Sequence, residues 1–68
     1  MEKIEITTDY IKLDQVLKLA GIAKTGADAK VFISDGIVRV NDKVEMQRGK
    51  KLRKGDVIEI GNNKFIIV

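Results

Sequence analysis

The sequence contains neither cysteine nor histidine. Disulfides are therefore excluded, and the usual zinc ligand sets cannot form. The side chains most often used for acid–base and nucleophilic catalysis are also missing. The ten carboxylates form no recognisable catalytic motif, and the glycines match neither a Walker loop nor a dinucleotide fingerprint. We therefore expect a protein that is not an enzyme and that holds no metal or cofactor.

Aromatic residues and long apolar runs are scarce as well. Two phenylalanines, one tyrosine and no tryptophan argue against a protein that stacks successive bases of a single strand. We expect Phe32 and Phe65 to lie in the core and Tyr10 to cover the first helix, with base stacking the less favoured role for Tyr10. No apolar run approaches 18 residues and the N-terminus shows no cleavage signal, so we expect a cytoplasmic protein.

The chain does contain enough hydrophobic residues to form one small core. Hydrophobic residues make up 44% of its 68 residues, which excludes a disordered chain. A chain of this length forms a single domain, here residues 1–68, and buries only about 60% of its unfolded surface. Such a domain has no room for a deep cleft, so we expect no small-molecule substrate. We also expect a monomer.

The hydrophobic pattern begins with a short strand and two helices. Ile4 and Ile6 alternate with charged residues, which predicts a half-buried strand. Apolar residues at Leu13, Val16, Leu17 and Ala20 follow helical spacing, and Gly21 provides a stop.

The second helix is expected to begin at Thr25. Thr25 can accept a hydrogen bond from the first turn, and Asp28 completes a capping-box pattern. Ala29, Phe32 and Ile33 supply the buried stripe, and Gly36 ends the helix.

The rest of the chain predicts a small antiparallel sheet of about four strands. Val38 and Val40 alternate with a charged residue, and Asn41-Asp42 is turn chemistry. The later strands are expected at 43–45, 57–60 and 65–68, with a basic loop before the second of them. The fold class is therefore α+β, with a short N-terminal strand, two helices and this sheet.

The basic loop is the strongest functional feature in the composition. The net charge is only +3, but five of the seven residues from Arg48 to Lys54 are basic and none is acidic. Such a cluster suits the phosphates of a nucleic acid backbone. A solvated loop that merely keeps the protein soluble is the alternative.

Residues 12–60 resemble the S-four RNA-binding domain family, whose two-helix unit is called the αL motif. The resemblance rests on Lys12-Leu13-Asp14, the turn Thr25–Lys30, the hairpin Val38–Asp42 and the strand start Gly55–Ile58. The whole chain resembles the stand-alone bacterial members of about 70 residues. This resemblance implies binding to structured RNA, most readily rRNA or a ribosomal subunit, with a role in subunit maturation or translation.

The resemblance and the basic loop together give a set of expected RNA-binding residues. Thr25 is expected chiefly to cap its helix, and Asn41 chiefly to fix its turn. The full set is Lys12, Lys24, Thr25, Gly26, Lys30, Asn41, Lys43, Arg48, Lys50, Lys51, Arg53 and Lys54.

Two positions depart from the family pattern. Gly26 stands where an arginine is frequent, which removes one expected phosphate contact, and Asp42 stands where the turn glycine is usual. The alternative function is a protein-interaction adaptor whose basic loop docks on an acidic partner. Membrane binding is not expected, because neither helix is strongly basic.

Overall fold

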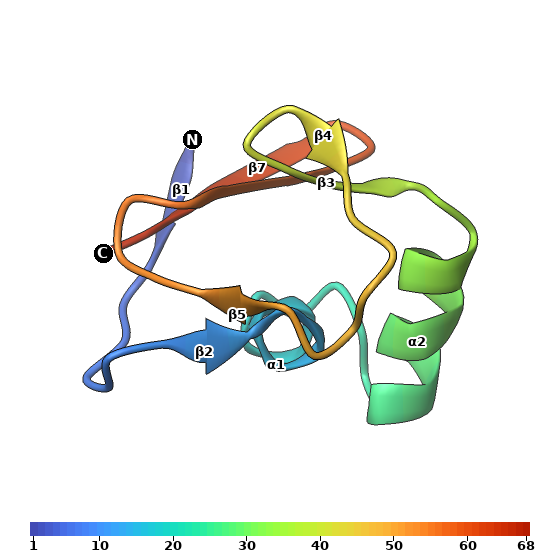
Figure 1. Cartoon of the computed structure of the whole chain (residues 1–68), viewed down its shortest axis with the longest axis horizontal. Coiled ribbons are helices and arrows are strands. Elements are labelled where there is room, and N and C mark those ends of the chain that lie inside the picture. Colours follow the sequence, from blue (N-terminus) through green and yellow to red (C-terminus); the bar gives the residue numbers. More distant parts are fainter.

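The computed structural model describes all residues from Met1 to Val68 (Figure 1). The elements, in chain order, are β1 (Glu2–Ile4), β2 (Ile11–Lys12), α1 (Leu13–Leu19), α2 (Gly26–Ser34), β3 (Val38–Val40), β4 (Lys43–Val44), β5 (Lys51–Leu52), β6 (Val57–Ile60) and β7 (Asn63–Ile67). The predicted α+β class, with an N-terminal strand, two helices and a mostly antiparallel sheet, is confirmed.

The main sheet has five strands in the order β1-β7-β6-β3-β4. All neighbours are antiparallel except β1, which joins β7 in parallel as an edge strand. The hairpin between β3 and β4 turns through Asn41 and Asp42, whose φ angles are 51° and 70°. Two positive φ angles in a two-residue loop match the twist of antiparallel strands, and Asn and Asp tolerate them better than most residues.

The two helices form where their spacing predicts. Leu13, Val16 and Leu17 bury the inner side of α1, and Gly21 follows it with φ of 77°. The hydroxyl of Thr25 accepts a hydrogen bond of 3.1 Å from the amide of Asp28, which confirms Thr25 as the N-cap of α2.

A second, two-stranded ribbon was not predicted from the sequence. Strands β2 and β5 are antiparallel, and Ile11 is opposite Leu52 while Lys12 is opposite Lys51. The segment expected to be an irregular basic loop therefore contains a strand. Leu52 is completely buried, so it holds the ribbon against the core.

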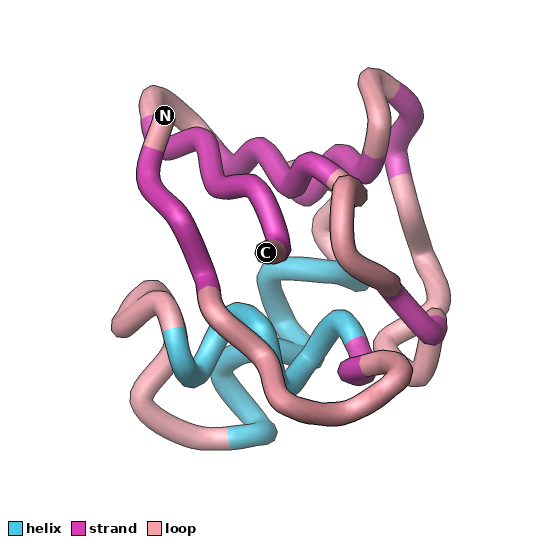
Figure 2. The backbone as a smooth tube through the Cα atoms, turned by 90° about the vertical axis from the view of Figure 1, so that its left-hand side faces the viewer, coloured by secondary structure: helices cyan, strands magenta, loops and turns pink.

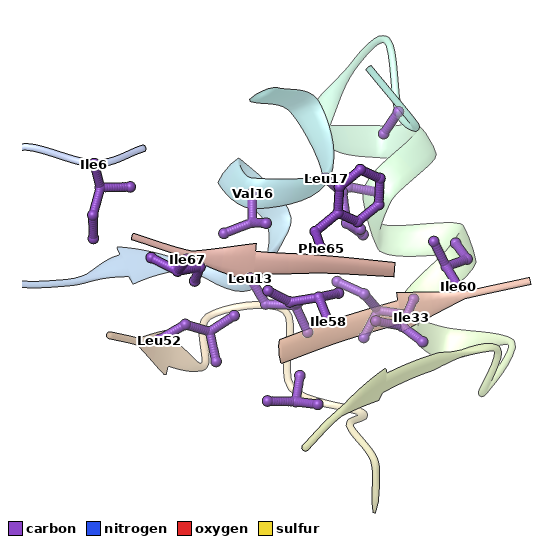
Figure 3. Packing of buried hydrophobic residues seen from close by; sticks show 14 residues of the cluster. Ile6, Leu13, Val16, Leu17, Ile33, Leu52, Ile58, Ile60, Phe65 and Ile67 are labelled. Carbon is purple, nitrogen blue, oxygen red and sulfur yellow. The ribbon is translucent and has the colours of Figure 1, made fainter. Parts of the chain in front are cut away.

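Fourteen buried hydrophobic residues form one core between the main sheet and the helical layer (Figure 3). Both views of the chain place the five-stranded sheet on one side and the two helices with the β2–β5 ribbon on the other (Figures 1 and 2). Phe65 is buried as predicted, whereas Phe32 is only half-buried at the edge of the core. No helix in the structure has the length and apolar character needed to cross a bilayer.

Candidate RNA interface

The β2–β5 ribbon places two lysines directly opposite each other. Lys12 and Lys51 are cross-strand partners, and both are exposed. Side chains on such partners share one face with Cβ atoms about 5 Å apart, and like charges there are destabilising. In water, two ammonium groups at ~6 Å repel each other by only about 0.7 kcal/mol. The fold tolerates this pair, and an anion between the two ammonium groups would remove the repulsion.

The chain before β5 brings further basic residues to the same place. The carbonyl of Lys50 accepts a 2.9 Å hydrogen bond from the amide of Leu13, and the carbonyl of Arg48 accepts one of 3.1 Å from the amide of Asp14. Free amides at a helix start need acceptors, and here the basic segment supplies them. Arg48 and Lys50 are therefore held beside Lys12 by backbone bonds, with exposed side chains.

We name Lys12, Arg48, Lys50 and Lys51 the ribbon cluster. All four side chains are exposed, and the backbone around them is fixed by the ribbon and by the start of α1. Charges on an ordered backbone lose less conformational entropy on binding than charges on a mobile loop. The cluster is therefore suited to bind an extended anion such as an RNA backbone.

The beginning of α2 provides a second group of predicted residues. Lys24, Thr25 and Gly26 are exposed at the start of this helix, and Lys30 lies one turn further on the same helix face as Gly26. In both views, this end of α2 lies on the side of the molecule away from the main sheet, as the ribbon does (Figures 1 and 2).

The remaining predicted residues lie nearer the main sheet. Lys43 is the first residue of the edge strand β4 and pairs with Val40. Arg53 and Lys54 lie on the connection that leaves the ribbon for β6. The structure thus divides the predicted set between the helical side and the sheet side.

Asn41 serves the fold with its side chain. Its Nδ2 donates a 3.1 Å hydrogen bond to Asp56, and its Oδ1 accepts one of 3.0 Å from the amide of Val57. Asp56 in turn accepts a 2.7 Å bond from the amide of Arg53. Asn41 therefore ties the β3–β4 turn to the turn before β6 and positions Arg53, in agreement with the structural role expected for it.

Acidic residues lie among the predicted basic residues, including Asp28, which is exposed in the first turn of α2. One carboxylate oxygen of Asp14, in the first turn of α1, is buried and has no hydrogen-bond partner. Asp42 is exposed at the tip of the β3–β4 hairpin, at the sheet side. The acid that departs from the family pattern is thus on a hairpin of the main sheet, whereas the ribbon cluster belongs to the separate two-stranded ribbon.

Sequence reasoning missed one feature of this surface. Thr8, Tyr10, Ile11, Lys12 and Gln15 line an open hollow of about 450 Å³ beside the ribbon cluster. Tyr10 is 39% exposed and lies outside the core cluster. The ammonium of Lys51 lies 4.8 Å from the centre of the Tyr10 ring. Only the pairing of β2 with β5 brings these two residues together.

A two-helix unit with basic residues at both helix starts, closed by a small antiparallel sheet, is the arrangement expected of the αL motif that the sequence resembles. The family model described as "S4 domain" matches residues 4–68. The chain belongs to the S4 domain family, the family that its motifs resemble.

Individual relatives cover nearly the whole chain. A Bacillus subtilis (strain 168) protein named "Probable ribosome maturation protein RlbA" is 47% identical over 66 residues, which is 96% of this chain and 93% of that protein. An Escherichia coli (strain K12) protein named "Putative RNA-binding protein YbcJ" is 30% identical over 59 residues, covering 87% of this chain and 84% of YbcJ.

The solution structure of Escherichia coli YbcJ is similar throughout. It superposes with a TM-score of 0.76 at 28% identity, covering all of this chain and 87% of YbcJ. That structure is described as revealing an αL motif involved in RNA binding.

Proposed function

We propose that this protein is a monomer that binds structured RNA within rRNA or a ribosomal subunit. It acts in subunit maturation or translation through this binding and not through catalysis. The observation that carries the proposal is the ribbon cluster, in which Lys12 and Lys51 oppose each other beside Arg48 and Lys50. The 47% identical relative is named for ribosome maturation, and the E. coli relative for RNA binding, which supports the same conclusion.

The physical basis is charge neutralisation. Each lysine or arginine that meets a phosphate releases condensed counterions, which gives affinity with little sequence preference. Duplex RNA hides its base edges in a deep groove, so proteins that bind it read mainly its shape and its phosphates. Four cations on an ordered backbone can contact several phosphates of one folded RNA.

The proposed interface extends from the ribbon cluster to Lys24 and Lys30 on the α2 side. Gly26 offers only its backbone there, and Thr25 is engaged as the N-cap. We assign Arg53, Lys54 and Lys43 to the margin of the proposed interface.

The function is tested by binding of the purified protein to total rRNA and to duplex DNA over a range of salt. Four phosphate contacts give a log–log slope of roughly −3 to −4, with preference for rRNA. Weak, equal binding to both nucleic acids would contradict the proposal. In cell extracts, the protein should sediment with ribosomal subunits and be released by nuclease, whereas an adaptor held by a protein would stay bound after nuclease treatment.

The location is tested by two double variants with equal charge change. Lys12→Glu with Lys30→Glu alters the proposed interface, and Lys3→Glu with Lys64→Glu alters β1 and β7 of the main sheet. Each pair lowers the net charge from +3 to −1. Loss of binding in the first variant alone is expected, with both proteins folded. Equal loss in both variants would show a general charge effect and refute the assigned surface.

A further inference from the structure

We infer that the hollow beside Tyr10 binds one unpaired nucleotide, whose base stacks on the Tyr10 ring while the ribbon cluster holds the neighbouring phosphates. This inference rests on the proposed RNA-binding function and specifies its ligand further. It assigns to the protein a preference for an RNA helix that carries a bulged or unpaired nucleotide over a continuous one.

The first support is the exposure of Tyr10. Tyr10 is 39% exposed and lies outside the core cluster, although aromatic side chains bury more apolar surface than most residues. The ring borders the hollow that Ile11 and Lys12 also line. An exposed flat ring beside a cationic cluster is the combination that binds bases of unpaired nucleic acid.

The second support is that Tyr10 is held in place. The Thr8 hydroxyl donates a 2.7 Å hydrogen bond to the Tyr10 carbonyl, and strand β2 begins at the next residue. The Lys51 ammonium lies over the ring at 4.8 Å. Tyr10 lines the hollow, whereas Lys51 is not among the lining residues. A ring on a backbone held in this way loses less entropy when a base stacks on it than a ring on a mobile loop.

The third support is the chemistry of the hollow. A cavity of about 150 Å³ is large enough for benzene, so a hollow of about 450 Å³ has room for a base and part of its sugar. Gln15 lines it with an amide that can both donate to and accept from a base edge. Lys12 lines the hollow and also belongs to the ribbon cluster, which connects the base position to the phosphate position.

The sequence itself allows a direct test. Tyr10 is the only tyrosine and there is no tryptophan, so the intrinsic fluorescence of the protein reports on this ring alone. Two RNA hairpins would be compared, one with a continuous stem and one with a single unpaired adenosine in the same stem. Stacking contributes enough for the bulged hairpin to bind about 5- to 100-fold more tightly. It should also quench the tyrosine emission more strongly.

Two substitutions complete the test. Tyr10→Phe keeps the flat ring and should keep the preference for the bulged hairpin. Tyr10→Ala removes the ring, and the ratio of the two affinities should fall to about one. Equal affinity of the parent protein for both hairpins, or a preference that survives Tyr10→Ala, would overturn this inference while the proposed function stands. Failure to bind either hairpin would overturn both.

Discussion

Asn41 offers a sharp test of how the turns near the interface are held. Asn41 and Asp42 are adjacent and both have positive φ, so glycine relieves backbone strain equally at either position. Only Asn41 makes side-chain hydrogen bonds, one to Asp56 and one from Val57. Asn41→Gly and Asp42→Gly therefore separate the effect of these bonds from the effect of the backbone conformation.

The expected magnitudes follow from the two bonds. Each contributes about 0.5–1.5 kcal/mol net, so their loss costs roughly 1–3 kcal/mol, part of which the relief of strain offsets. We expect Asn41→Gly to lower the free energy of unfolding by about 1–2 kcal/mol. In a domain of this size that lowers Tm by roughly 5–15 °C. We expect Asp42→Gly to be neutral or to raise the free energy of unfolding by up to ~1 kcal/mol.

Thermal unfolding followed by circular dichroism measures both variants against the parent. Urea unfolding provides the free energies, and an unchanged m-value would show that the unfolded state is comparable. If Asn41→Gly were as stable as the parent, or if the two variants shifted Tm equally, Asn41 would not be the link between the two turns.

Three further predictions concern the helix start, the interface and the ribbon. Thr25→Ala removes the N-cap bond of α2 and should lower the free energy of unfolding by about 1 kcal/mol, with Thr25→Ser nearly unchanged in a urea titration. Gly26→Arg introduces the cation that is frequent at this position in the family, and an added Cβ there would meet no atom within 4 Å. The affinity for rRNA should rise, and the log–log salt slope should steepen by about 0.9. An unchanged slope would place α2 outside the interface. Leu52→Ala empties a fully buried position on β5 and should cost about 2–5 kcal/mol in chemical unfolding, while a loss below about 1 kcal/mol would mean that the ribbon is not anchored by this side chain.

The main fold was predictable because its signals are local. Helical spacing from Leu13 to Ala20, the cap at Thr25 and the turn at Asn41-Asp42 each act within a few residues of the chain, and the structure confirms all three. The parallel pairing of β1 with β7 joins the two ends of the chain. No local pattern specifies such a partner.

The sequence predicts which basic residues form the candidate site, but not how they are arranged relative to one another. The basic residues were visible in the sequence, but β2 and β5 have two residues each, too few to show an alternating pattern. Their register depends on the apolar pair Ile11 and Leu52, which only tertiary packing brings together. The opposition of Lys12 to Lys51 and the hollow beside Tyr10 follow from that register.

The central claim is that the ribbon cluster binds RNA phosphates, and the salt dependence of rRNA affinity tests it most directly. The parent protein would be compared with Lys12→Gln/Lys51→Gln, which removes both opposed charges and leaves Leu52 and the core in place. Loss of two phosphate contacts should weaken binding and reduce the magnitude of the log–log slope by about 2. A variant with the parent's affinity and the parent's slope would contradict the account.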